Sequence, residues 1–324
     1  CCVAQGSGEV HAEIARLLEA TGADADLKRV GCIGMCHQTP LVELVMPDSE
    51  SKFFSHVQAE DVRDIVLKHF RPRGILRRLS YGVSRILDNL HSDEEENPVE
   101  KHALDVRDKA VCSFLGPQKH IATEYCGHLD PLDLDEYLSH DGFAAVERCL
   151  KQLSAVDNVN ELESSGLRGR GGAGCPTHIK WQKAKAANDA IKYVICNGDE
   201  GDPGAFMDRM LLESFPYRII EGMIIAAHTV AADEGIFYIR AEYPLAVKRI
   251  REAIGRCEER GLLGHNIMGT GRSFRLRVME GAGAFVCGEE TALIQSLEGH
   301  RGTPVLRPPY PVERGLNDHP TLIN

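Results

Sequence analysis

The residue types best suited to chemistry gather in glycine-rich stretches. The first, GLRGRGGAG at 166–174, places five glycines and two arginines in nine positions. Successive small residues let backbone N–H groups converge on an anion, and the arginines add charge-assisted donors. Gly169, Gly171 and Gly174 match G-x-G-x-x-G, a pattern that binds dinucleotides where it follows a strand and opens a helix.

The residues before this loop argue against that dinucleotide fold. AVDNVNELESSG at 155–166 spaces its apolar residues by three and is rich in Asp, Glu and Asn, which predicts a helix that ends at a glycine. Pro176 is placed to open the next helix, which carries Lys180. Two interpretations stay open from the residues alone: a phosphate cradle of another kind, or a flexible surface loop.

The second stretch, VICNGDEGDPGAF at 194–206, is an expected strand that runs into the polar residues Asn197, Asp199, Glu200 and Asp202. It is not a calcium loop, because Gly201 occupies a coordinating position. Carboxylates just past a strand suit the hydroxyls of a ribose or ribityl chain. An ordinary acidic turn is the competing interpretation.

The third stretch is GAGAFVCGEETAL at 281–293, which leads into an expected helix at 289–299. Glu289 and Glu290 fall in its first turn, where the helix dipole stabilises carboxylates. Capping alone would account for both acids. Three such turns, each beside a regular element, are harder to dismiss together than singly.

Cysteine spacing marks the N-terminal part. Cys32 and Cys36 have a C-x3-C spacing and follow Cys1 and Cys2 by about thirty residues, which is not the plant-type ferredoxin order. Eleven cysteines in 324 residues are too few for a secreted disulfide scaffold, so metal ligands and buried thiols are expected.

The length, the net charge and the apolar runs of the chain limit the class of protein. The chain exceeds what one core usually serves, so two or more domains are expected. A net charge of -11 argues against nucleic-acid binding, and no apolar run is long enough to predict a membrane span.

The elements that must position these stretches differ along the chain. Helices at 9–21 and 61–70 with a strand at 40–47 predict a small domain over residues 1–70, and an acidic linker follows at 71–110. Residues 111–324 are expected to form an α/β sheet with crossovers. The expected strands and helices alternate at 193–196, 212–233, 236–241, 244–261, 273–279 and 289–299.

Together the motifs GLRGRGGAGCPTHIKW, CNGDEGDPGAFMDR and GAGAFVCGEETALIQSLEGHRGTPVLRPPYP resemble the flavin-binding NADH subunit of respiratory complex I. NAD-linked hydrogenases and formate dehydrogenases, including electron-bifurcating ones, share this module. GDPGAFMDR and RAEYPLAVKRI are more similar to the hydrogenase branch. The resemblance covers 115–324 and implies an α/β domain that binds FMN without a Rossmann fold.

The resemblance also implies roles for named residues. The flavin and its phosphate would be lined by Gly169, Arg170, Gly171 and Gly172, with Lys180 nearby. The polar edge and ribityl chain would be held by Asn197, Asp199 and Glu200. Phe285, Gly288, Glu289 and Glu290 would close the pocket, with Glu290 orienting the nicotinamide, and Asn324 would begin a further flavin motif.

Several positions depart from that family's pattern. Cys175 and Lys183 stand where aromatic residues often stack on the NADH adenine, while Tyr310 keeps one aromatic. Arg307 replaces the usual lysine, and Asp202 is one methylene shorter than a frequent glutamate. Lys183 and Arg307 suit a 2′-phosphate, so both NAD(H) and NADP(H) stay open as partners of the flavin.

The N-terminal cysteines resemble a thioredoxin-like ferredoxin domain with the ligand order C-x4-C…C-x3-C. This implies a [2Fe–2S] cluster held by Cys2, Cys32 and Cys36, with the first ligand upstream of residue 1. A thioredoxin-like domain without a cluster is the alternative. The family's [4Fe–4S] ligands are expected beyond residue 324, so nothing in this stretch holds that cluster.

The resulting prediction is a cytoplasmic redox subunit of a multi-subunit oxidoreductase. Hydride would pass between NAD(P)H and FMN, and single electrons would pass to iron–sulfur clusters, with electron bifurcation as one mode. Expected partners are other iron–sulfur and catalytic subunits of a hydrogenase or formate dehydrogenase, and ferredoxin. The alternative is an FMN and iron–sulfur electron-transfer or scaffold subunit that does not bind NAD(P)H.

Overall fold

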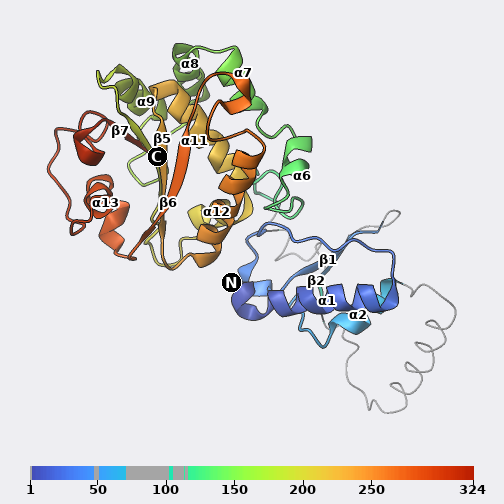
Figure 1. Ribbon diagram of the computed structural model, residues 1–324. Helices are drawn as coiled ribbons and strands as arrows, with labels where there is room; N and C mark the ends of the chain where they lie inside the picture. Colours follow the sequence, from blue (N-terminus) through green and yellow to red (C-terminus); the bar gives the residue numbers. More distant parts are fainter. Residues whose placement is uncertain (1, 47–50, 71–101, 105–112, 114–115) are drawn as a thin grey trace, which may run out of the picture. The chain divides into compact units, whose positions relative to one another are not determined.

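The computed structural model describes residues 2–46, 51–70, 102–104, 113 and 116–324 (Figure 1). The chain divides into two compact units: Cys1–Lys28 with Ile33–Ile121, and Arg29–Cys32 with Ala122–Asn324. Most of the linker expected at 71–110 lies outside the described residues.

The first unit packs two helices, α1 (Ser7–Thr21) and α2 (Val62–His69), beside a small antiparallel sheet. Its strands are β1 (Val42–Leu44), β2 (Lys52–Phe54) and β3 (Ala103–Leu104), and 3-10 turns lie at η1 (Val3–Gln5) and η2 (Cys36–Gln38). The predicted helices at 9–21 and 61–70 are confirmed as α1 and α2. Their apolar faces are buried against each other, as an amphipathic pattern predicts. The strand predicted at 40–47 is observed as the shorter strand β1, which covers Val42–Leu44.

The second unit begins with helices that lead up to the glycine loop: α6 (Leu134–Ser139), α7 (Ala144–Lys151), α8 (Ala155–Ser165) and α9 (Thr177–Ala186). Ser154 and Asp157 form a capping box that starts α8. Gly166 ends it with φ 65°, in the left-handed region that favours glycine. The prediction of a helix before the glycine loop is therefore confirmed.

A parallel sheet of order β6-β5-β4-β7 organises this unit. Its strands are β4 (Tyr193–Gly198), β5 (Glu234–Arg240), β6 (Arg275–Gly281) and β7 (Thr321–Ile323). The helices between them are α10 (Met207–Ser214), α11 (Pro216–Val230), α12 (Pro244–Glu259) and α13 (Glu290–Leu297). The remaining 3-10 turns are η3 (Ile267–Gly269), η4 (Phe285–Gly288) and η5 (Leu316–Asp318).

One prediction about these helices is wrong in detail. The helix expected at 212–233 is two helices, α10 and α11, separated at Phe215. Pro216 occupies the first turn of α11, where its missing N–H costs no hydrogen bond, so a new helix starts there.

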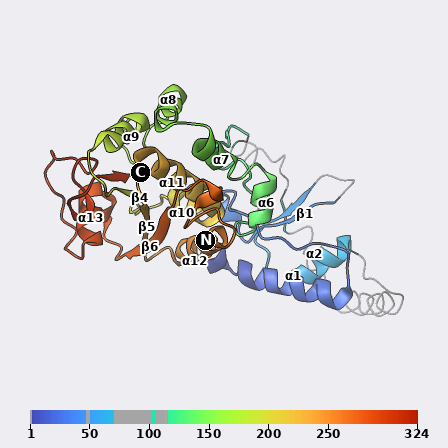
Figure 2. The same cartoon turned by 45° about the horizontal axis from the view of Figure 1, so that its top comes forward.

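Both faces of the sheet are covered. Along β5, Phe237 and Ile239 contribute to the large core formed with α11 and α12, whereas Ile236 and Tyr238 pack in a smaller core with α13. The alternation follows from the two-residue period of a strand. Figures 1 and 2 show α13 on one side of the sheet and α11 and α12 on the other. A sheet buried on both faces explains why its strands read as apolar runs.

The strand order reverses between β4 and β7. The connections from β4 to β5 and from β5 to β6 run through α11 and α12, and the connection back to β7 runs through α13 on the other face. Right-handed crossovers require this change of face when the direction of travel reverses. In open α/β sheets, ligands bind at the carboxyl edge where the order reverses. None of the described helices has the length and apolar character needed to cross a bilayer.

Candidate functional site

The carboxyl ends of β4 and β7 bring distant stretches together around Asn197. Its backbone N–H donates to the carbonyl of Asn324 at 2.7 Å, and its Nδ2 donates to the carbonyl of Gly288 at 2.9 Å. Its Oδ1 accepts from the N–H of Asp199 at 3.2 Å. The acidic turn, the third glycine stretch and the last strand therefore meet at one edge of the sheet.

The glycine loop is closed at its base and open above it. The N–H of Gly169 donates to the carbonyl of Cys175 at 2.9 Å, and Arg168 Nη1 donates to the carbonyl of Gly174 at 2.8 Å. A Cβ built at Gly171 or Gly172 would meet no atom within 4 Å. Packing within the unit therefore does not require glycine at Gly171, which is what a loop kept clear for a ligand would show. Gly172 has φ 101°, in the left-handed region that favours glycine.

Arg170, also in the loop, is exposed and has no hydrogen bond or ion pair among the described residues. Its guanidinium is therefore available as a donor to an anion at the loop.

Lys180 joins three elements at the carboxyl edge. Its Nζ lies 3.1 Å from Glu290 Oε2, and it donates to the carbonyl of Ile323 at 2.8 Å. Glu290 also accepts from Arg307 Nη1 at 2.7 Å. The structure thus brings together α9, the first residue of α13, the segment before β7 and β7 itself. Two cations hold the Glu290 carboxylate in position.

Two of the expected flavin-binding acids are already used as helix caps. Glu200 accepts from the backbone N–H groups of Asp208 and Arg209, at 3.0 and 3.1 Å, at the start of α10. Glu289 is the N-cap of α13, and its carboxylate accepts from the N–H groups of Thr291 and Ala292. Both caps satisfy donors that a helix start leaves without partners.

Asp199 behaves differently from these two acids. Its side chain is 1% exposed, and neither carboxylate oxygen has a hydrogen bond among the described residues. The nearest counter-charge is Arg240, whose Nε lies 3.8 Å from Oδ1. Burial raises the pKa of Asp199 to about 6, although the Arg240 charge opposes that shift. A buried carboxylate without a donor is unfavourable, so this position is held at a cost to the fold.

Phe285, Gly288 and Asp202 lie around the same turn. A Cβ at Gly201 would come within 2.6 Å of the Phe285 ring, and one at Gly288 within 3.1 Å of the Asp199 carbonyl oxygen. Glycine at these positions permits η4 to approach the acidic turn. The Phe285 ring is largely exposed, and Asp202 is exposed in the loop that follows.

Tyr310 carries two cations near its ring. Lys183 Nζ lies 5.4 Å from the ring centre, and the guanidinium carbon of Arg307 lies 5.9 Å from it. Lys183 comes from α9, three residues beyond Lys180, so one helix supplies both lysines. Cys175, which precedes that helix, is exposed.

Asn324 follows β7 and completes the edge. Its backbone N–H donates to the carbonyl of Ile195 at 3.0 Å. With its amide oriented to satisfy its neighbours, its side-chain oxygen accepts from Trp181 Nε1 at 2.7 Å. Trp181 is buried in α9, so this contact fixes the helix that carries Lys180 against the last strand.

The expected cluster ligands do not form a complete site among the described residues. Cys2 precedes η1 and Cys36 opens η2, and Gln5 and Thr39, which lie three residues after these cysteines, are hydrogen-bonded to each other. Cys32 is grouped with the second unit. No set of three or more His, Cys, Asp or Glu side chains suited to a metal ion occurs within the described ranges.

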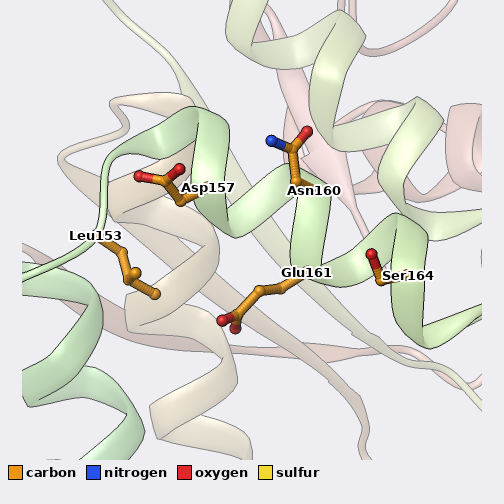
Figure 3. A pocket seen from close by; sticks show the side chains of 5 residues that line it. All are labelled: Leu153, Asp157, Asn160, Glu161 and Ser164. Carbon is orange, nitrogen blue, oxygen red and sulfur yellow. The ribbon is translucent and has the colours of Figure 1, made fainter.

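A surface hollow of about 510 Å³ lies elsewhere, along α8 (Figure 3). It is lined by Leu153, Asp157, Asn160, Glu161 and Ser164. Asp157 belongs to the capping box of α8, and Glu161 pairs with Arg148. The side chains that line the hollow include neither basic nor aromatic residues, although Ser164 precedes the glycine loop by only two positions.

Sequence reasoning missed residues that organise the site, namely Arg240, Tyr243 and Trp181. Arg240 Nη1 and the Tyr243 hydroxyl both donate to the carbonyl of Glu200, at 2.6 and 3.0 Å. A signal was present, because Arg240 ends the strand β5, as Asn197 and Gly198 end β4, and parallel strands bring such ends together.

Comparison with known proteins adds independent support for the fold and family. The family model of the Nuo51 FMN-binding domain matches residues 162–324, half of the chain. The NADP-reducing hydrogenase subunit HndC of Solidesulfovibrio fructosivorans is 49% identical over 207 residues, which are 64% of this chain and 42% of that protein. An NADH-quinone oxidoreductase subunit of Escherichia coli is 46% identical over 195 residues, 60% of this chain and 44% of that one.

A solved structure of an NAD+-reducing [NiFe]-hydrogenase in the H2-reduced state matches with a TM-score of 0.53 and 28% identity. The match covers 97% of this chain and 47% of the other. The chain therefore spans less than half the length of the relatives it matches. The expected family and the expected α/β class are confirmed by these matches. The chain belongs to the Nuo51 FMN-binding domain family.

Proposed function

We propose that this protein is a redox subunit that binds FMN at the carboxyl edge of the parallel sheet and exchanges hydride between NAD(P)H and that flavin. The observation that carries the proposal is the meeting of the acidic turn, the third glycine stretch and the last strand around Asn197, which donates hydrogen bonds to the carbonyls of Gly288 and Asn324. Relatives described as NADP-reducing hydrogenase and NADH-quinone oxidoreductase subunits support it.

The residues present fit FMN on two counts. The open glycine loop offers backbone N–H groups and Arg170 for the phosphate. Asp199 is a buried carboxylate to which no described residue donates a hydrogen bond. A ribityl chain carries hydroxyl donors of the kind that Asp199 lacks. When bound, FMN supplies the hydride acceptor and then releases electrons one at a time.

The protein's part in this reaction is to bind and orient. Lys180 adds positive charge between the loop and α13, and Asn197 fixes the acidic turn against η4. Glu290, held by Lys180 and Arg307, is the residue that we assign to orienting the nicotinamide. Phe285 is exposed beside the turn and is positioned to cover a planar ring. Glu200, Glu289 and Asp202 complete the proposed lining.

Nucleotide choice is the finer part of the proposal. The pair of cations at Tyr310 suits a 2′-phosphate, so we propose that NADP(H) is accepted beside NAD(H). Lys183→Met is expected to raise the KM for NADPH about tenfold and leave that for NADH unchanged. Lys185→Met, on the same helix, is the matched control. A strong preference of the wild-type protein for NADH in steady-state kinetics would remove this part.

We propose that Cys2, Cys32 and Cys36 hold a [2Fe–2S] cluster, as their resemblance to the ligands of a thioredoxin-like ferredoxin domain implies. The contact between Gln5 and Thr39 supports it by tying together the segments of Cys2 and Cys36. Iron and sulfide analysis with electron paramagnetic resonance tests this. Cys36→Ser is expected to abolish the cluster signal, and Cys149→Ser, at a buried position in α7, is expected to preserve it. Equal signals in both variants would contradict the assignment.

An anaerobic absorption spectrum with and without NAD(P)H separates the main candidates. A flavin band that bleaches on addition of the nucleotide supports the proposal. A flavin band that does not bleach supports instead the electron-transfer or scaffold subunit, which the loss of aromatics at Cys175 and Lys183 favours. A protein without a flavin band contradicts both.

The partners are proposed from the same reasoning. We expect other iron–sulfur and catalytic subunits of a hydrogenase, formate dehydrogenase or related complex, and ferredoxin where the reaction bifurcates electrons. Because NAD(P)H is its proposed substrate, the cytoplasm is the proposed location. Mass spectrometry of what co-purifies with the native chain identifies the partner enzyme, and isolation without any redox subunit would contradict this part.

A further inference from the structure

Arg240, at the carboxyl end of β5, has an arrangement that neither strand pairing nor surface charge explains. Its side chain is 15% exposed, and each nitrogen of its guanidinium faces a different group. Nη1 donates to the Glu200 carbonyl at 2.6 Å, and Nη2 donates to Glu242 Oε1 at 2.7 Å. The third nitrogen, Nε, has no hydrogen bond to any residue that the structure describes, and it lies 3.8 Å from Asp199 Oδ1.

The Glu200 carbonyl is held a second time. The Tyr243 hydroxyl donates to it at 3.0 Å, and the Tyr243 ring lies 5.8 Å from the Arg240 guanidinium carbon. The peptide that follows Asp199 is therefore held by two donors from the end of β5 and the turn after it. These contacts fix the acidic turn without any ligand, and they leave one unsatisfied donor next to one unsatisfied carboxylate.

We propose that Arg240 is a positioning residue of the flavin site, which fixes the turn after β4 through the Glu200 carbonyl and keeps the Asp199 carboxylate charged to receive a hydroxyl of the ligand. This inference rests on the proposed FMN site. An ionised carboxylate accepts hydrogen bonds from hydroxyls with both oxygens, and more strongly than the protonated acid does. A fixed neighbouring guanidinium favours the ionised form. Arg240 thus acts through Asp199.

The groups that set this charge are few. Within the part of the chain that the structure describes, the charged or titratable groups facing Asp199 are Arg240 and Tyr238 of β5 and Glu242 in the turn after it. Arg240 favours the carboxylate, whereas Glu242 disfavours it, and burial is the largest influence. Removing Arg240 and removing Glu242 should therefore shift the titration of Asp199 in opposite directions, which no general loosening of the turn would produce.

The test measures FMN dissociation constants of the purified chain by quenching of flavin fluorescence from about pH 5 to about pH 8. The wild-type protein is expected to bind FMN more weakly below a pH midpoint that lies near the pKa of Asp199. Arg240→Gln is expected to raise the dissociation constant about tenfold at neutral pH and to move the midpoint upward. Arg240→Lys is expected to recover most of the loss.

Two further variants keep the result interpretable. Glu242→Gln removes the partner of Nη2 and is expected to move the midpoint downward, and it serves if Arg240→Gln does not fold. Arg277→Gln breaks a surface pair with Glu234 and is expected to change nothing.

The outcomes separate this inference from the function on which it rests. Wild type that binds no FMN overturns the proposed function and this inference with it. Wild type that binds FMN while both the Arg240 and Glu242 variants keep its midpoint overturns this inference alone.

Discussion

The glycine loop at 166–174 and the acidic turn after β4 both belong to the proposed site and are built in opposite ways. Among the described residues the loop has hydrogen bonds at its base, and a Cβ added at Gly171 or Gly172 would meet no atom within 4 Å. The turn is held by Asn197, Arg240 and Tyr243, all through hydrogen bonds. The glycine loop is therefore the open side of the proposed site, and the acidic turn is its rigid side.

This difference shows how the protein divides the work of binding. The loop leaves donors exposed to solvent, where they cost nothing, so it can adapt to a phosphate. The turn instead buries Asp199 without a donor, which is unfavourable until a ligand supplies one. A site of this kind is preorganised on the side that carries the specificity.

The largest expected effect comes from filling the open side. Gly171→Val places a branched side chain where no protein atom lies within 4 Å, so stability should change by less than about 0.5 kcal/mol. If the loop binds the flavin phosphate, the FMN dissociation constant should rise by about 100-fold or more. Ser164→Val, an exposed change on the preceding helix, is the control. Unchanged FMN binding in Gly171→Val would leave the loop as an ordinary surface turn.

The second prediction concerns the rigid side without its ligand. Because burial raises the pKa of Asp199 to about 6, protonation stabilises the fold at low pH, and this contribution is lost as pH rises through that value. Asp199→Asn should therefore make the FMN-free protein more stable than wild type by about 1–3 kcal/mol near pH 7.5, with little difference near pH 4. Urea unfolding at both pH values measures this. Equal stability near neutral pH would mean that the carboxylate has a donor.

The Asp199→Asn variant can also be tested by measuring FMN binding. Asp199→Asn should also weaken FMN binding, so stability and function should move in opposite directions, as they do where a fold tolerates an unfavourable group for function. A variant that gained stability and bound FMN as tightly as wild type would show that Asp199 is not a flavin ligand.

The smallest expected effect belongs to an acid that is already satisfied. Glu289→Ala removes the N-cap of α13 and should lower the free energy of unfolding by about 1 kcal/mol, seen as a drop of a few degrees in Tm. Unlike Asp199→Asn, it removes a carboxylate that already accepts from backbone N–H groups, so stability should fall rather than rise. Glu280→Ala, in a surface pair with Arg251, is the control. A gain in stability would show that the Glu289 carboxylate, like that of Asp199, is unfavourable for the fold.

Local sequence signals predicted much of the fold. Gly166 ends α8, and Pro176 is the residue before α9, because both act on the few residues around them. The break between α10 and α11 was missed, although Pro216 marks it, because an apolar pattern of helical period runs through both helices. Of the site, the three motifs were identified from composition and spacing, but not which of their acids were free to bind.

The sequence by itself determined the composition of the site, since glycines, carboxylates and lysines at these spacings are local properties. Only the tertiary structure decided their roles, because it put β7 beside β4 and so brought Asn324 to Asn197. The same packing gave Glu200 and Glu289 backbone donors, whereas Asp199 has Arg240 as its nearest counter-charge and no hydrogen-bond donor among the described residues. The reason is physical: whether a carboxylate is satisfied depends on donors contributed by chain segments far away in the sequence.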